Sequence, residues 1–212
     1  FETSAELGNI RNGNTKDPYS PSVYGVGILG TKYPSKVNGV LTKEYKLWSN
    51  MLKRCYSDFA KKNQPTYEGC EVSDNFKSYE YFYEWCNEQI GFGNEGWQLD
   101  KDLLTKGNKV YSETTCVFIP HEINSVLTKS TASRGKYPIG VSFCKVKNKF
   151  ISGISIGGKH QNLGYFDNEW SAFLAYKKAK ENRAKELAEK WRGQIDDRVY
   201  KKLLEYKVLI TD

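Results

Sequence analysis

The sequence predicts an α+β protein, with an N-terminal ββα unit followed by a C-terminal three-stranded antiparallel sheet packed on a helix. Three observations predict this class. Apolar residues recur at helical spacing in two N-terminal segments and one long C-terminal segment. Short segments rich in β-branched and aromatic residues lie between Gly- and Asn-containing turns. Of the 212 residues, 39% are hydrophobic and 14% aromatic, which is enough for a buried core.

The N-terminal part is expected to begin with a loop and to continue with two amphipathic helices. The chain up to about residue 42 is rich in Gly, Pro, Asn and Ser, and only residues 23–29 favour a short strand. The spacing of apolar residues then predicts one helix over 44–56 and another over about 76–90. The segment between them, AKKNQPTYEG, is typical of a turn.

The next segment is expected to form strand, loop, strand and helix in that order. The two strands are predicted over 97–103 and 115–119, with a Gly-Asn loop between them. A short helix is predicted from Pro120 to about Leu127, since proline suits the first turn of a helix, where no N–H partner is needed. We place a domain boundary in the following linker, TKSTASRGK.

Beyond the linker, the pattern predicts three strands and two helices. The strands are expected over 139–146, 149–156 and 160–166, joined by an Asn-containing turn and a Gly-Gly turn. A helix is expected over 169–192, capped by Asp167 or Asn168 and ended by Gly193, before a shorter helix over 196–206. The expected domains are therefore residues 1–128, 129–192 and a C-terminal helix and tail over 193–212.

Charge is distributed unevenly along the chain. The net charge is +7, but residues 129–207 hold 18 Lys and Arg against 8 Asp and Glu, and residues 123–166 contain no acidic residue. A solvated basic surface normally has acidic residues interspersed. A long basic stretch without them favours a polyanionic partner.

Other features exclude several classes of protein. No run approaches 18 apolar residues, so a membrane span is not expected, and the first residues lack the pattern of a signal peptide. The cysteine count is odd and there is no CxxC, which argues against a disulfide framework and against a zinc site of cysteine pairs. We expect a reduced, cytoplasmic protein with five ordinary thiols: Cys55, Cys70, Cys86, Cys116 and Cys144.

The C-terminal segment carries four short motifs in order. They are Gly140-Val141, Phe150 with Ile154, the run LGYF over 163–166, and Ala175-Tyr176. In their order and spacing over about 50 residues they resemble the plant ethylene-response-factor (Apetala-type) DNA-binding domain. The resemblance implies a sheet on a helix, with one sheet face contacting double-stranded DNA.

The strand pattern agrees with this resemblance. Because side chains alternate between the two faces of a strand, Phe150 and Ile154 are expected to face the helix. The opposite face is then small, polar or basic, and its candidate DNA contacts are Ser142, Cys144, Lys145, Lys147, Lys149, Ser155, His160 and Asn162. Ser142, Cys144 and Ser155 stand where the plant domain has base-reading arginines, so phosphate contact by lysine is the firmer expectation. A basic surface for protein contact is the alternative.

A second resemblance covers about residues 24–124. The segment LDKDLLTKGNKVYSETTCVFIPHEIN, with WSNMLKRCY and YEGCEVSDNFKSYEYFYEW before it, resembles the HNH endonuclease family in the degenerate form found among tailed-phage proteins. The resemblance implies a ββα-metal domain. It assigns Asp100 and Asn124 as ligands of one divalent metal ion, Mg²⁺ or Mn²⁺. Lys101 stands where the family has its general-base histidine, and Thr115 replaces the asparagine that orients the water.

Both departures affect water activation, and the sequence offers substitutes. His121 lies one helical turn before Asn124 and is a candidate base, whereas Lys101 as a cation could support the transition state. Asp102 is expected on the same strand face as Asp100, where it could add a second carboxylate.

The two resemblances together imply a phage-type endonuclease, of the homing kind, that hydrolyses or nicks double-stranded DNA in the cytoplasm of a bacterial host. The alternative is a catalytically inactive relative that binds DNA as a regulator or inhibitor.

Overall fold

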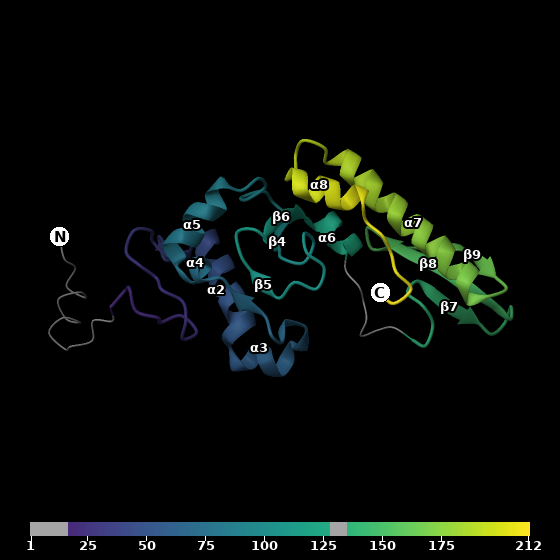
Figure 1. The fold of residues 1–212 in the computed structure, drawn as a ribbon, viewed down its shortest axis with the longest axis horizontal. Coiled ribbons are helices and arrows are strands. Elements are labelled where there is room, and N and C mark those ends of the chain that lie inside the picture. Colours follow the sequence, from purple (N-terminus) through teal and green to yellow (C-terminus); the bar gives the residue numbers. More distant parts are fainter. Residues whose placement is uncertain (1–16, 128–134) are drawn as a thin grey trace. The chain divides into compact units, whose positions relative to one another are not determined.

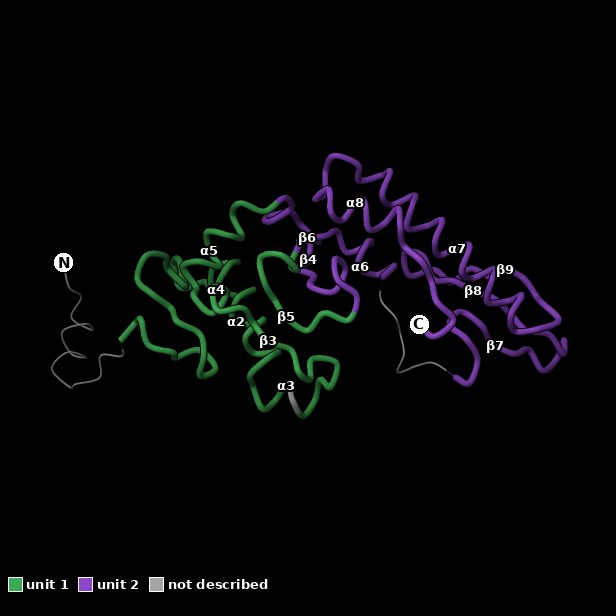
Figure 2. The backbone as a smooth tube through the Cα atoms, in the orientation of Figure 1, with its two compact units in different colours: residues 1–89, 107–116 green, residues 90–106, 117–212 purple. Residues whose placement is uncertain are grey.

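The computed structural model describes residues 17–127 and 135–212, which form a mixed α+β protein (Figure 1). The chain divides into two compact units (Figure 2). Unit 1 comprises the chain up to residue 89 together with 107–116, and unit 2 comprises 90–106 together with 117–212. The expected domain boundary at residues 128 and 129 lies outside the described residues, and the two units divide the chain at other positions.

Unit 1 is mainly helical. Its helices are α2 (Lys43–Tyr56), α3 (Asp58–Asn63), α4 (Asp74–Lys77), α5 (Tyr79–Glu88) and the 3-10 helix η1 (Pro65–Tyr67). Its strands are β1 (Lys36–Val37), β2 (Val40–Leu41), β3 (Glu71–Val72) and β5 (Val110–Tyr111). β1 pairs with β2 in antiparallel fashion, whereas β3 and β5 are parallel. Aromatic side chains fill the core, where the indole N–H of Trp48 donates to the backbone oxygen of Phe76 at 2.8 Å.

The predicted first helix is confirmed as α2, but the single helix over 76–90 is wrong. Two helices, α4 and α5, stand there, because Ser78 has an extended backbone and ends one while capping the other. Its hydroxyl accepts from the N–H of Tyr81 at 3.3 Å. The apolar spacing runs through this break, since Phe76 and Tyr79 are both fully buried. The strand expected over 23–29 is reduced to two isolated bridges, Val23 to Gly27 and Ile28 to Ser78.

Unit 2 contains a two-stranded hairpin with its helix, and a three-stranded sheet with two more helices. The first group is β4 (Trp97–Asp100), β6 (Val117–Pro120) and α6 (His121–Leu127). The second group is β7 (Val141–Cys144), β8 (Lys149–Ile156), β9 (Lys159–Phe166), α7 (Glu169–Lys190) and α8 (Asp197–Leu204). β4 and β6 are antiparallel, and the larger sheet is antiparallel in the order β7-β8-β9.

The predicted three-stranded antiparallel sheet is confirmed, and β8 has the bounds that the sequence predicts. The two hairpin turns use residues with left-handed backbone: Asn148 at φ 51°, and Gly157 and Gly158 at φ 58° and 77°. Asn168 is the residue that caps α7, accepting from the N–H of Ser171 at 2.8 Å. Pro120, expected in the first turn of α6, instead ends β6 opposite Trp97.

Helix α7 belongs to both parts of unit 2. Its N-terminal half buries Phe173 and Tyr176 against Ile154 of the sheet. Its C-terminal half buries Ala184 and Leu187 in a second cluster. That cluster also holds residues of β6, α6 and α8: Val117, Ile119, Ile123, Val126, Val199 and Leu203. Twenty-two residues give a helix of about 33 Å, which is long enough to serve both clusters.

Within the described residues, no helix combines the length and the apolar character that crossing a membrane requires.

Candidate nucleic-acid interface and metal site

Helix α7 packs on one face of the larger sheet. We define the open face by the residues whose side chains point away from α7. They are Ser142, Cys144, Lys149, Ile151, Gly153, Ser155, His160, Asn162 and Tyr165. The strand pairing places them together, since directly opposed residues share a face: Ser142 lies opposite Ile151, and Ser155 lies opposite His160. The side chains that sequence reasoning assigned to DNA contact on these three strands therefore share this face.

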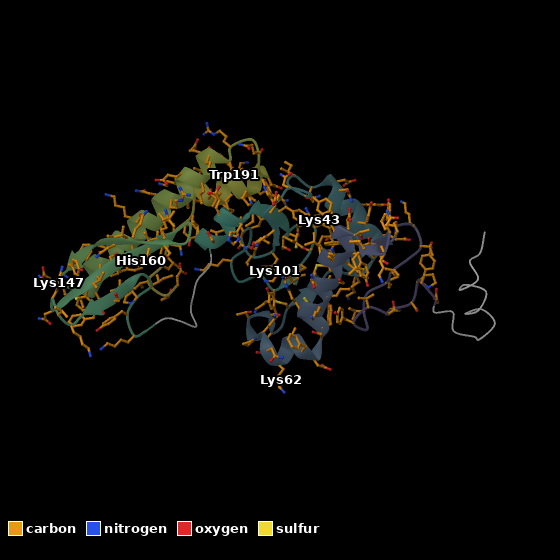
Figure 3. All side chains as sticks on the ribbon, turned by 180° about the vertical axis from the view of Figure 1, so that it is seen from behind. Lys43, Lys62, Lys101, Lys147, His160 and Trp191 are labelled. Carbon is orange, nitrogen blue, oxygen red and sulfur yellow. The ribbon has the colours of Figure 1, made fainter. Side chains whose placement is uncertain are left out.

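The two remaining candidates, Lys145 and Lys147, lie in the β7–β8 turn and are exposed (Figure 3 labels Lys147). The ammonium of Lys147 lies 3.9 Å from the centroid of the Tyr165 ring, a cation–π contact on the open face. Lys149 forms an ion pair with Asp167, and both side chains are substantially exposed. Lys145, Lys147 and Lys149 therefore gather at the β7–β8 turn.

Tyr165 also lies on the open face, although the sequence pattern did not predict it there. The pairing of β8 with β9 shifts between Ser152 and Gly153, so β9 holds one extra residue there. Beyond this extra residue the side chains of β9 alternate in the opposite phase, which turns Tyr165 to the open face. Asn162 accepts from the N–H of Gly164 at 2.8 Å, so this side chain holds the bulge in addition to lying on the open face. Gly164, at φ 133°, is the sequence signal for the bulge.

His160, labelled in Figure 3, lies opposite Ser155 near the β8–β9 turn, and its ring reaches over Gly153. A Cβ atom built on Gly153 would lie 2.5 Å from Cε1 and 2.6 Å from Nε2 of His160. The imidazole therefore occupies the space that any larger residue at 153 would need. The residue as a whole is exposed.

The hairpin of unit 2 positions Asp100 at the last residue of β4. Its Oδ1 accepts from the N–H of Asp102 at 2.9 Å and of Leu103 at 2.7 Å, which turns the chain out of the strand. Burial raises the pKa of Asp100 above its usual range, although these two backbone N–H groups act in the opposite direction.

Asn124 lies on α6 beside the same strand. Its amide Nδ2 donates to Oε1 of Gln98 at 2.6 Å. Gln98 and Asp100 are two residues apart on β4, so they share a face of that strand. The structure thus brings Asp100 and Asn124 to one face of β4, as the sequence predicts.

The expectation for Asp102 is wrong, and Lys101 is placed unexpectedly. β4 ends at Asp100, so Asp102 lies in the following turn and not on the strand face. Lys101 is only 6% exposed, and its ammonium donates to the carboxylate of Asp102. A buried, ion-paired lysine is a structural cation, and it gives no accessible base at the position of the family's histidine.

The other two catalytic candidates lie on different elements. Thr115 belongs to unit 1, where its hydroxyl donates to the backbone oxygen of Val110 at 2.8 Å and its Oγ1 accepts from the N–H of Ser112 at 3.1 Å. His121 is the first residue of α6, the helix that carries Asn124, and is exposed.

A metal ion would find few ligands here. Among the described residues, no group of three His, Cys, Asp or Glu side chains is arranged to hold a metal. One carboxylate and the amides of Asn124 and Gln98 are hard oxygen donors, and Mg²⁺ usually keeps several waters and takes only one or two protein carboxylates. The donor set therefore fits a weakly held Mg²⁺ or Mn²⁺ ion.

Glu122 fastens α6 to the C-terminal end of α7. Its carboxylate accepts from the ammonium of Lys190 and from the indole N–H of Trp191, the latter at 2.6 Å, and it lies 3.5 Å from Arg183. Partial burial raises the pKa of Glu122, but the hydrogen bonds from Lys190 and Trp191 outweigh it and hold the pKa below its usual range. These contacts of Glu122 fasten α6, the helix that carries Asn124, to α7, the helix that packs on the sheet.

Comparisons of the chain with protein-family models, with curated proteins and with solved structures find no match.

Proposed function

We propose that the chain binds double-stranded DNA through the open face of the β7–β9 sheet. The supporting observation is the make-up of this face, which has small and polar side chains in its middle and Lys145, Lys147 and Lys149 at one end. Three strands about 4.8 Å apart make a surface roughly 10 Å wide, which is comparable with a major groove about 12 Å wide. Small side chains allow the sheet to approach the bases, while lysines contact phosphates.

The alternative of a protein-contact surface is less consistent with the charge. No acidic residue occurs over 123–166. Binding to a protein does not require a segment of this length without acidic residues, whereas binding to a polyanion favours one.

The proposal is tested by titrating the full chain against a fluorescent duplex. Lys145→Glu with Lys147→Glu should weaken binding by at least about tenfold, since each lost phosphate contact also introduces repulsion. Lys178→Glu with Lys185→Glu changes the net charge equally at exposed positions of α7 and is the matched control. Equal losses in the two double variants would contradict binding by the sheet face.

Metal-dependent cleavage or nicking of DNA is a second candidate function, favoured by one observation. Asp100 and Asn124 share a face of β4 within a strand, strand and helix arrangement. An ion held there would polarise the scissile phosphate and stabilise the leaving oxygen. His121 would supply the accessible base. The buried ion pair of Lys101 favours the alternative, a catalytically inactive DNA-binding regulator or inhibitor.

A plasmid-nicking assay with Mg²⁺, with Mn²⁺ and with EDTA separates these possibilities. An enzyme should nick only with a divalent ion and lose nicking in Asp100→Ala and Asn124→Ala, with DNA affinity retained. No nicking with either ion by a chain that still binds the plasmid would leave the regulator as the function.

A further inference from the structure

A hollow of about 950 Å³ opens at one edge of the sheet in unit 2. β7 pairs with β8 only up to Ser152, and Gly153 donates to the backbone oxygen of Gly140 at 3.0 Å. β8 continues to Ile156 beyond this point, and the hollow lies beside that overhang. Its walls come from the segment 135–140, the end of α6, the sheet and the middle of α7. The volume falls within the range of small-molecule sites, about 300–1,000 Å³.

The hollow is basic. Lys136, Lys145, Lys180 and His160 line it, and none of its described lining residues is acidic. Lys180 is only 5% exposed, and its ammonium lies 5.5 Å from the centroid of the Tyr176 ring. The cationic side chains along the walls favour a ligand that carries negative charge.

The hollow is also aromatic. The rings of Tyr137, Phe143 and Tyr176 contribute to its lining. Gly140 lies directly on the Tyr176 ring, because a Cβ atom there would meet the ring at 2.1 Å, and this contact holds Tyr176 in place. Tyr137 packs edge-to-face on Phe150 at 5.4 Å, so its ring is also held while remaining part of the wall. Fixed aromatic rings beside lysines are suited to a planar ligand that carries negative charge, because rings stack and ammonium groups pair with phosphate.

The hollow is continuous with the open face. Ser142, Ile151, Gly153, Ser155 and His160 belong to both. We infer that the hollow takes one unstacked nucleotide, base and phosphate together, from a DNA strand that lies on the open face. This inference rests on the proposed DNA binding. Unstacking a nucleotide costs least where it is mismatched or unpaired, so the hollow selects DNA with such a nucleotide over intact duplex.

The test compares three ligands for the full chain: an intact duplex, the same duplex with one extra unpaired nucleotide, and a free deoxynucleoside monophosphate. The expected result is that the duplex with the unpaired nucleotide binds about tenfold more tightly than the intact one, a preference within the range of base stacking on an aromatic ring.

Lys180→Met should abolish this preference while retaining the apolar stem of the side chain. Lys178→Met removes the same charge from an exposed position of α7 and should keep the preference. Lys136→Gln with Tyr137→Leu, at one exposed and one half-buried lining position, gives a second test should Lys180→Met fail to fold.

The outcomes separate the hollow from the sheet face. Equal affinity for the two duplexes with no binding of the monophosphate overturns the inference and leaves DNA binding by the open face standing. Binding of the monophosphate without binding of either duplex supports a nucleotide site with a free nucleotide as its source, and overturns the proposed function. A preference for the unpaired nucleotide that survives in every variant of the hollow also overturns the inference, since it then reflects the flexibility of the DNA.

Discussion

Gly153 determines where His160 lies on the open face. The shortest contacts of a Cβ atom there would be with the far end of the exposed His160 side chain, which can swing away at little cost, and the backbone oxygen of Gln161 at 3.3 Å would have to shift only slightly. Gly153→Ala should therefore leave the unfolding free energy within about 1 kcal/mol of wild type while weakening DNA binding several-fold. The check is a double-mutant cycle, in which Gly153→Ala should add nothing once His160 is alanine. Full additivity of the two losses would show that the glycine acts independently of His160.

Glu122 gives a pH-dependent contribution to stability. Its folded-state pKa lies below the usual value of 4.5, so its stabilisation is fully present above pH 4.5 and is lost as the pH falls through the folded pKa. Glu122→Gln should cost about 1 kcal/mol at pH 7, and this difference from wild type should shrink in acid. Chemical denaturation at several pH values measures it. Glu186→Gln, which removes another partner of Arg183 at a more exposed site, should cost little at any pH.

At the scale of the strand, the register of β8 determines which of its side chains pack against α7 and which lie on the open face. Ile154 is buried against α7 and Ile151 is half-buried on the open face. Ile154→Ala should destabilise the protein by roughly 2–5 kcal/mol, the usual cost of truncating a buried side chain. Ile151→Ala should cost less than about 1 kcal/mol and should weaken DNA binding instead. Denaturation and DNA titration of both variants measure the two effects. The reverse pattern would mean that the register is wrong by one residue.

How far the sequence predicts an element depends on what ends it. β8 and α2 follow from alternation and helical spacing, because burial on one face decides both. The end of β4 does not, because it depends on the carboxylate of Asp100 reaching the N–H groups two and three residues later. The break at Ser78 is hidden for a related reason: its hydroxyl caps α5 while the apolar spacing continues. Hydrogen bonds of single polar side chains therefore set the ends of β4 and α4, which the spacing of apolar residues does not predict.

The candidate site was predictable to a similar degree. The open face follows from strand parity as far as Asn162, and the bulge then brings Tyr165 onto it. The resemblance in the sequence pairs Asp100 with Asn124, and in the structure the hydrogen-bond partner of Asn124 on β4 is Gln98, two residues before Asp100. The burial of Lys101 does not follow, because it depends on the turn that Asp100 makes after the strand.

At the scale of the molecule, unit 2 joins the proposed DNA-binding sheet and the candidate metal residues in one compact body. Helix α7 provides buried residues to both clusters, and Glu122 fastens α6 to its C-terminal end. The proposed DNA-binding sheet and the face of β4 are therefore linked through packed helices. The two compact units divide the chain at positions other than the expected boundary between residues 128 and 129.

The salt dependence of DNA binding by the full chain tests the central claim most directly. If lysines at the β7–β8 end contact phosphates, log K should fall linearly with log salt concentration, because binding releases counterions. The slope should become less steep by about 2 in Lys145→Gln with Lys147→Gln, roughly one unit for each lost contact. An unchanged slope in this variant, or a wild-type affinity that does not vary with salt, would contradict binding of DNA by the open face.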